Sequence, residues 1–331
     1  MSTAVPVELA DPTLTAEIAD GLALVERDLA AATRAEEALL AEASAHLIEA
    51  GGKRFRATLV LLAGQFGNPH DERIVQAATA IELTHLATLY HDDVMDEAAI
   101  RRGHPSANSR WTNTVAILTG DFLFARASQI LAELGAEAIR IQAHTFSRLV
   151  SGQIAETIGP RPGEDPLAHY LRVVKDKTAS LVATAGRFGA MFSGGPPEVV
   201  KRVEPACEAI GVAWQLSDDI LDVASESAES GKMPGTDLRE GVRSVPVLYV
   251  LQSTGAGDAR LRELLTSADL TDRALHAEAL SLLRAHPAMD AARADLRRWA
   301  DAARSQIAAL PDVPARYAFE AMCDYVVDRT S

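Results

Sequence analysis

The stretch TAIELTHLATLYHDDVMDEAA, residues 79–99, predicts a helix that carries acidic residues near its end. At about 3.6 residues per turn, positions seven and eleven residues apart fall near one face, so His85, Asp92 and Asp96 share a stripe. Asp93 lies about 100° away and is expected to support the other two. Asp92 and Asp96 repel each other at the unfavourable end of the helix dipole. A cation should compensate, and Mg²⁺ is suited because it takes one or two carboxylates and completes its shell with water and phosphate oxygens.

A solvated acidic turn is the alternative interpretation of a single Asp-Asp-x-x-Asp pattern in an acidic protein. The neighbouring residues argue against it, because this helix is too apolar to be a rod on the surface. Its large apolar residues are Leu83, Leu86, Leu89 and Tyr90. Taken alone, the pattern favours a binding site without establishing one.

A second acidic helix is predicted by ACEAIGVAWQLSDDILDVASE, residues 206–226. Spacings of three, four and seven residues place four polar side chains on one face: Gln215, Asp218, Asp219 and Asp222. The surrounding residues are again apolar, and an unpaired buried charge costs several kcal/mol, so stability alone does not explain these carboxylates. Two such helices, more than a hundred residues apart in the sequence, can face each other across a bundle and hold metal ions.

The composition of the 331 residues is that of a soluble globular protein, with 48% hydrophobic and 24% charged residues. Aromatic residues are sparse at 5%, whereas the helix formers Ala, Leu, Glu and Arg abound. A net charge of -14 argues against a general nucleic-acid binder. It does not exclude an anionic ligand, because a basic pocket or a bound metal can outweigh the overall field.

The location expected from the sequence is the cytoplasm. Cys207 and Cys323 are too few for a disulfide framework. The N-terminus shows no secretory signal. Apolar runs such as residues 57–63 are far shorter than the roughly 20 residues that span a bilayer. We therefore expect no transmembrane segment and at most peripheral contact with a membrane.

Helical patterns cover most of the chain, and no series of alternating strands stands out. No break is long or polar enough for a domain linker, so we expect one all-α domain over residues 1–331, a helical bundle. Predicted loops lie at 103–108 and 225–243, the second of them mobile. The expected helices are 12–50, a stretch from GGKRFR through Leu62, a helix capped by Asp71 and running to about 99, then 112–134, 136–157, 166–192, 198–224 and most of the remainder.

Basic residues occur at the breaks, where a metal–diphosphate group would need them. Backbone beside the double glycine of GGKRFR can approach an anion closely. Each basic residue alone could be a solvated surface group, so the argument rests on the combination. The set comprises Lys53, Arg54 and Arg56, then Arg101 and Arg102, then Lys175 and Lys177 before Thr178, and Lys232.

In order, GGKRFR, LYHDDVMDEAAIRRG, KDKTASL, QLSDDILD and GKMPGTDLREG closely resemble the motifs of the trans-type (E-type) polyprenyl diphosphate synthases. The resemblance spans residues 51–246. It implies an all-α bundle around a deep central cavity (the isoprenoid synthase type I fold), usually in a homodimer. It also implies a reaction that condenses isopentenyl diphosphate with a growing allylic diphosphate and uses about three Mg²⁺ ions.

The resemblance also implies roles for individual residues. Those that match the isopentenyl diphosphate site are Lys53, Arg56, His85 and Arg102. Those that match the groups holding the allylic diphosphate are Arg101, Lys177, Thr178, Gln215 and Lys232. The Mg²⁺ ligands would be Asp92, Asp96 and Asp218, with Asp93, Asp219 and Asp222 completing the catalytic motifs.

Two departures from the family pattern leave the metal ligands untouched, so we expect activity. Val242 stands where a Lys is common, and Gln153 and Glu156 stand where many members have Glu and Gln. The residues that form the floor of the product tunnel match Ala87 and Thr88, which are both small. A tunnel left open predicts a long polyprenyl product, for a quinone side chain or a carrier lipid.

Three alternatives stay open at this point. A short-chain synthase would stop at farnesyl or geranylgeranyl diphosphate. A class I terpene cyclase shares the fold and the first acidic motif, but usually carries a different second motif and needs no isopentenyl site. A non-catalytic subunit of a heteromeric synthase typically loses metal ligands. The complete second motif and GGKRFR favour the synthase.

Overall fold

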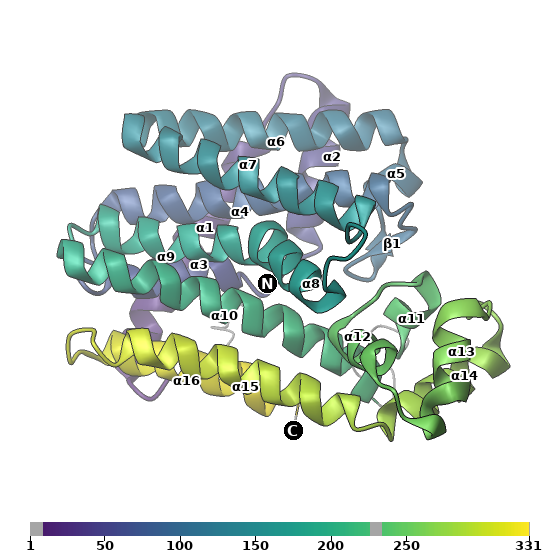
Figure 1. The fold of residues 1–331 in the computed structure, drawn as a ribbon. Helices are drawn as coiled ribbons and strands as arrows, with labels where there is room; N and C mark the ends of the chain where they lie inside the picture. Colours follow the sequence, from purple (N-terminus) through teal and green to yellow (C-terminus); the bar gives the residue numbers. More distant parts are fainter. Residues whose placement is uncertain (1–8, 226–233, 331) are drawn as a thin grey trace. The chain divides into compact units, whose positions relative to one another are not determined.

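A computed structural model describes residues 9–225 and 234–330, which are almost entirely helical, as predicted (Figure 1). The only strands among these residues form a hairpin of two residues each, paired antiparallel. The elements are α1 (Pro12–Ala32), α2 (Ala38–Glu49), α3 (Phe55–Gly64), α4 (Glu72–Met95), β1 (Ile100–Arg101), β2 (His104–Pro105), α5 (Ala107–Arg110), α6 (Asn113–Leu134), α7 (Ala136–Ile158), α8 (Pro166–Val174), the π-helical turn η1 (Lys175–Ala179), α9 (Ser180–Phe192), α10 (Pro197–Ala224), α11 (Thr236–Glu240), α12 (Val245–Gln252), the short 3₁₀ turn η3 (Ala256–Asp258), α13 (Ala259–Ser267), α14 (Arg273–Arg284), α15 (Ala288–Ile307) and α16 (Pro314–Asp328).

The chain falls into two compact units whose segments interleave in the sequence. The first unit comprises the described residues through Ser147, with Leu181–Cys207 and Gln306–Ala321. The second comprises Arg148–Ser180, Glu208–Ser305 and the described residues from Met322 onward. The expectation of a single domain over residues 1–331 therefore stays a prediction.

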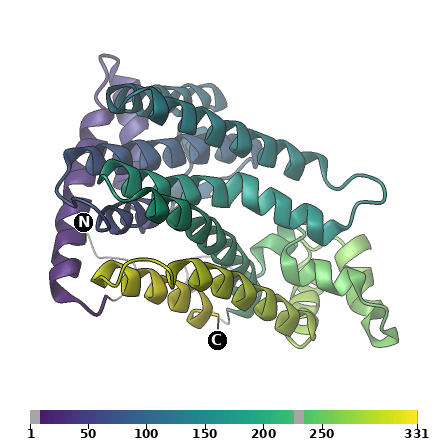
Figure 2. The ribbon, with the colours of Figure 1, turned by 60° about the vertical axis from the view of Figure 1, so that its left-hand side comes forward.

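Helix α4 forms the centre of the first unit and carries the first acidic motif. It packs against α1, α3 and, most extensively, α6, helices that Figures 1 and 2 show from two sides. The predicted cap is confirmed, because the Asp71 side chain accepts a hydrogen bond from the Arg73 backbone N–H. Close packing is possible because α6 presents Gly120 to α4, where a Cβ atom would lie 3.1 Å from the carbonyl oxygen of Ala87.

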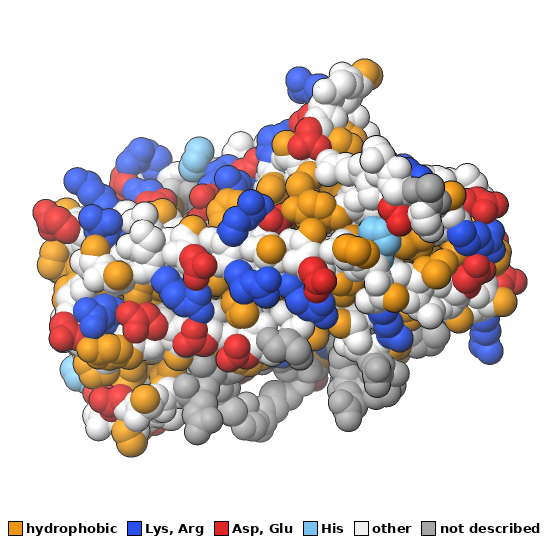
Figure 3. Space-filling model, turned by 60° about the horizontal axis from the view of Figure 1, so that its bottom comes forward, with side chains coloured by type: hydrophobic (Ala, Val, Ile, Leu, Met, Phe, Trp, Pro, Cys, Tyr) orange, Lys and Arg blue, Asp and Glu red, His pale blue; other side chains and the backbone are white. Residues whose placement is uncertain are grey.

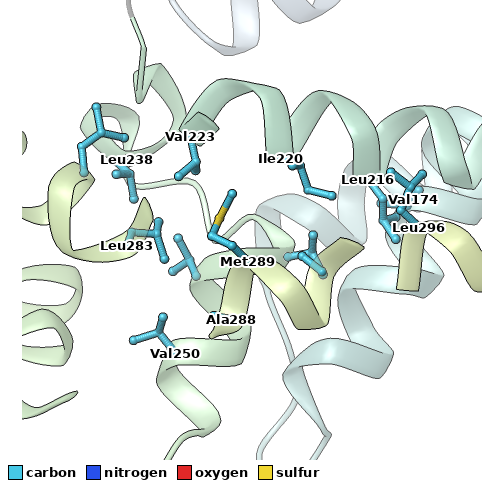
Figure 4. Packing of buried hydrophobic residues seen from close by; sticks show 14 of the residues in the cluster. Val174, Leu216, Ile220, Val223, Leu238, Val250, Leu283, Ala288, Met289 and Leu296 are labelled. Carbon is cyan, nitrogen blue, oxygen red and sulfur yellow. The ribbon is translucent and has the colours of Figure 1, made fainter. Parts of the chain in front are cut away.

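An apolar cluster in the second unit explains the hydrophobic flank of the second acidic motif. On α10, Leu216, Ile220 and Val223 recur at helical spacing and are buried against α12, α14 and α15 (Figure 4). Met289 and Val250 belong to the same cluster. Burial of this face fixes the rotation of α10, and with it the direction in which the motif carboxylates leave the helix.

Several predicted elements need correction. The helix predicted to run from Asp71 to about residue 99 ends at Met95, and the predicted loop 103–108 contains β2 and the start of α5. The predicted helix 12–50 is two helices, because α1 ends at Thr33, whose hydroxyl bonds to the Ala30 carbonyl, and because Arg126 donates to the Arg34 carbonyl at 2.8 Å. The predicted helix 166–192 contains the π-helical turn η1. Part of the predicted loop 225–243 is helix α11, and the remainder, residues 226–233, lies outside the described residues.

The surface does not separate the two signs of charge on the face drawn in Figure 3, where acidic and basic side chains alternate. Among the described helices, α6 alone is long and apolar enough to cross a membrane by length and composition, and the expectation of no transmembrane segment stays a prediction. A core helix of a soluble protein has the same properties, and α6 is partly buried in the first unit.

Candidate active site

The first acidic motif, at the end of α4, divides into buried and accessible carboxylates. Asp93 is fully buried and accepts a hydrogen bond from Arg101 Nε at 2.6 Å. Burial raises the pKa of Asp93, and the Arg101 charge opposes that rise. Asp92 is half-buried, and Asp96 is exposed at the C-cap of the helix. Asp93 thus fixes Arg101, while the two residues of the predicted stripe stay accessible.

Arg54 of the GGKRFR segment holds the start of α3 rather than an open site. It has the left-handed φ of 46°, is buried, and donates two hydrogen bonds to Glu26. Glu82 of α4, also buried, accepts from the Ala57 backbone N–H at 3.0 Å and lies 3.9 Å from Arg54 Nη1. Sequence reasoning assigned no role to Glu82, although a lone acidic residue in an apolar helix was a usable signal.

Arg102 ties the hairpin after α4 to the double glycine. Its Nη1 donates to the carbonyl oxygens of Leu47 and Gly51, the former at 2.8 Å. A side chain at Gly52 would meet the guanidinium at 3.1 Å, so glycine is needed there. Burial, together with nearby Arg54, lowers the pKa of Arg102 to about 10, so it stays charged at neutral pH.

His85 of α4 lies within the field of four arginines of the first unit. Burial, followed by the charges of Arg56, Arg102, Arg54 and Arg101, holds the pKa of His85 well below its usual range. The imidazole is therefore neutral at pH 7 and can donate or accept a hydrogen bond without adding charge. Guanidinium groups beside a neutral donor form a site suited to a phosphate or diphosphate.

Asp219 is the buried carboxylate of the second motif. It accepts three hydrogen bonds, from the Tyr170 hydroxyl at 2.6 Å, the Gln215 side-chain amide at 3.1 Å and the Val245 backbone N–H at 3.0 Å. Burial outweighs these donors and raises the pKa of Asp219 to about 6. Asp219 therefore anchors its neighbours on α8, α10 and α12.

Asp222 and Asp218, the other members of the motif, have different surroundings. The Asp222 carboxylate accepts from the backbone N–H groups of Thr236 and Asp237 at 3.1 and 3.0 Å, so it caps the start of α11. Asp218 is about half-exposed and accepts from Arg329 Nη2 at 2.6 Å. Arg329 was not singled out from the sequence, because it lies 111 residues away.

The π-helical turn η1 carries Lys177 and Thr178, which lie in the second unit with the second acidic motif. Lys177 Nζ forms an ion pair with Glu156, and Thr178 Oγ1 donates to Gln215 Oε1 at 3.4 Å. A Cβ atom at Gly152 would lie 2.5 Å from the Lys177 backbone nitrogen, so only glycine permits this approach of α7. The remaining predicted ligand of the allylic diphosphate, Lys232, lies outside the described residues.

The carboxylates present fit a hard divalent cation that keeps several waters. Within residues 9–225 and 234–330, no three His, Cys, Asp or Glu side chains form a ready-made metal-binding group. Mg²⁺ is usually bound by one or two carboxylates, with water and substrate phosphates completing its octahedron. The accessible carboxylates Asp92, Asp96 and Asp218 supply oxygen ligands of this kind.

Comparison with known proteins decides the family. The sequence pattern described as polyprenyl synthetase matches residues 37–283. The chain belongs to this family. The resemblance and the all-α fold inferred from the sequence are therefore confirmed, and the chain is a polyprenyl diphosphate synthase, a prenyltransferase of isoprenoid biosynthesis.

Individual relatives match over nearly the full length. A nonaprenyl diphosphate synthase of Mycobacterium tuberculosis is 49% identical over 98% of this chain and 96% of its own. Component 2 of a heptaprenyl diphosphate synthase from Geobacillus stearothermophilus is 37% identical over 94% and 97%. The crystal structure of geranylgeranyl pyrophosphate synthase from Corynebacterium glutamicum, complexed with calcium and isoprenyl diphosphate, has a TM-score of 0.88 at 43% identity and covers 98% of this chain and all of its own.

The neutral state of His85 can be tested by NMR. With the imidazole labelled, we expect no titration between about pH 6 and 8, because a pKa depressed by burial and four arginines lies below that range. Arg56→Gln removes one positive charge and should raise the pKa, and saturating inorganic diphosphate should raise it further. A His85 resonance that titrates near pH 6.5 would contradict the assignment.

Proposed function

We propose that the protein condenses isopentenyl diphosphate with an allylic diphosphate, in a Mg²⁺-dependent head-to-tail trans reaction that yields a long polyprenyl diphosphate. The observation that carries the proposal is the neutral His85 among four arginines on the helix that bears the first acidic motif. Membership of the family supports it, and so does the relative whose printed name is nonaprenyl diphosphate synthase.

Isopentenyl diphosphate would be held by residues of the first unit. Arg56, Arg102 and the exposed Lys53 would supply positive charge, and neutral His85 would supply a hydrogen bond. A buried guanidinium held by backbone carbonyls, as in Arg102, needs little reorganisation when the anion arrives.

The allylic diphosphate would be held by Lys177, Thr178 and Gln215, with Arg101 and Lys232. We propose Asp92, Asp96 and Asp218 as ligands of Mg²⁺, which supplies Lewis-acid stabilisation of the departing diphosphate when bound. The allylic carbon–oxygen bond breaks and diphosphate leaves with the electron pair. The isopentenyl double bond then attacks the allylic cation to form the new carbon–carbon bond, and the resulting cation loses a proton to the released diphosphate. Apolar residues around the cation would exclude water.

Product length is the finer part of the proposal. Ala87 of α4 is 2% exposed, and it lies five residues before Asp92, about 7.5 Å along the helix axis. Ala87 and the neighbouring Thr88 are both too small to close a tunnel. The names of the relatives support either outcome, since one makes nonaprenyl and another geranylgeranyl chains. The small side chains of Ala87 and Thr88 support the long product.

The reaction is tested by incubating the purified chain with isopentenyl and farnesyl diphosphates and Mg²⁺, followed by chain-length analysis. We expect products well beyond geranylgeranyl diphosphate, and none after chelation of the metal or for Asp92→Asn, where turnover should fall more than about 100-fold. Products ending at farnesyl or geranylgeranyl length would contradict the long-chain proposal. A product formed without isopentenyl diphosphate would favour a terpene cyclase instead.

The floor is tested by Ala87→Phe, which should shorten the product because an aromatic ring would project where the chain must pass. The matched control is Thr88→Ser, which removes one methyl group and should leave the product unchanged. Both variants are first checked for an unaltered unfolding temperature, because Ala87 is buried beside Gly120. A folded Ala87→Phe enzyme with the wild-type product length would show that the floor lies elsewhere.

A homodimer is also proposed, with an apolar face of the first unit as the contact. This face comprises Ile117 and Leu118 of α6, which are 42% and 57% exposed. Two consecutive large apolar residues exposed on one helix favour a partner protein, and a second copy is the family's usual one. The buried cysteines Cys207 and Cys323, which form no disulfide, suit the proposed cytoplasmic location.

Sedimentation of the purified chain should give twice the chain mass, and Leu118→Asp should shift it towards the monomer, because a charge would be buried in an apolar contact. Thr114→Asp at the exposed start of the same helix is the control. If wild type is inactive until a second protein is added, the heteromeric alternative gains, as the heptaprenyl component in Geobacillus would suggest.

A further inference from the structure

Arg329 is the first residue after α16, and its guanidinium is directed at a single turn of α10. Nη2 donates to the Trp214 carbonyl at 3.0 Å and to Asp218 Oδ1 at 2.6 Å, and Nε donates to Ser217 Oγ at 2.6 Å. The guanidinium also stacks on the Trp214 ring, 4.2 Å from its centroid. All four contacts lie within the second unit.

This arrangement differs from the surface ion pairs of the same region. The Arg329 side chain is only 11% exposed, whereas Arg304 is 34% exposed and bridges two exposed aspartates, Asp301 and Asp324. An exposed pair holds neither partner in one geometry. Three hydrogen bonds and a ring contact leave the Arg329 guanidinium one orientation, and that orientation fixes the Asp218 carboxylate.

We propose that Arg329 is a positioning residue for the second acidic motif. It holds Asp218 through Oδ1, so that Oδ2 is presented in a fixed direction to a divalent cation. Within the described residues, Oδ1 is the Asp218 oxygen that takes a hydrogen bond. The inference rests on the proposed role of Asp218 as a metal ligand and adds the group that orients it.

The other charges around Asp218 support this assignment. Asp219 is held by Tyr170 and Gln215, and Asp222 by the backbone of α11. Asp218 is the motif residue with the greatest exposure, and without Arg329 its side chain would be free to rotate. Orientation by an outer hydrogen bond typically changes metal affinity about 10- to 100-fold. Repulsion between the guanidinium and the cation is screened, because Asp218 is 48% exposed.

The test measures binding of Mn²⁺ in the presence of inorganic diphosphate, from the free-ion signal in electron paramagnetic resonance, on the full-length protein without turnover. Arg329→Ala should weaken Mn²⁺ binding about tenfold or more. Arg329→Lys keeps the charge but loses the planar, stacked donor, so it should fall between Arg329→Ala and wild type. Arg304→Ala, which removes a surface pair, should bind as wild type.

The Mg²⁺ dependence of steady-state turnover is a second test of the positioning role. For Arg329→Ala the half-saturating Mg²⁺ concentration should rise by about the same factor, with kcat largely recovered at high Mg²⁺. A purely structural role would lower the unfolding temperature without changing the metal dependence. If Arg329→Ala does not fold, Arg329→Lys and Arg329→Gln carry the same comparison.

The Asp218→Asn variant distinguishes the proposed role of Asp218 as a metal ligand from the proposed role of Arg329 in positioning it. If Asp218→Asn weakens Mn²⁺ binding and a folded Arg329→Ala does not, or binds more tightly, Asp218 is a ligand and the positioning role is wrong. If neither variant changes binding, Asp218 is not a ligand, and both the inference and that part of the proposed function are wrong.

Discussion

Burial of carboxylates in apolar helices is the constraint on which both motif-bearing helices depend. An isolated buried charge costs several kcal/mol, so each such group needs its own partners before the helix can pack. Asp93 has Arg101, and Asp219 has three donors from α8, α10 and α12. Tyr170 and Val245 come from segments 49 and 26 residues away from Asp219, so satisfying that charge also fixes where those segments lie.

In both acidic motifs, one aspartate of the Asp-Asp pair is buried and the other is accessible. In each Asp-Asp pair the second residue, Asp93 or Asp219, is buried and organises the surrounding chain. The first residue, Asp92 or Asp218, is more accessible. A helix turns by about 100° per residue, so adjacent residues face different surroundings. In each Asp-Asp pair the buried aspartate can therefore anchor the neighbouring chain while the accessible aspartate presents a ligand. This explains why each motif needs both aspartates.

Sequence reasoning succeeded where chemistry and helical spacing were local. The helix that carries His85 and Asp92 and the cap at Asp71 follow from a few consecutive residues. It failed where the partner was remote: Arg329 beside Asp218 has no local signature, and the acidic Glu82 did not reveal its partner at the start of α3, 25 residues away. The break after α1 was missed for the same reason, since no Gly or Pro marks it and Arg126 of α6 stabilises the turn.

The arginines around His85 in the first unit are held close together in the folded protein, and this arrangement favours binding of an anion. Arg54, Arg102 and Arg56 lie close enough to depress the pKa of His85, so the folded state holds like charges against their repulsion. Glu26 and Glu82 offset Arg54. Burial, followed by the charge of Arg54, lowers the pKa of Arg102 to about 10. A bound diphosphate would relieve the repulsion between these arginines. The neutral His85 adds a hydrogen-bond donor without adding to that repulsion. The repulsion that opposes folding therefore strengthens binding of the anion once the protein is folded.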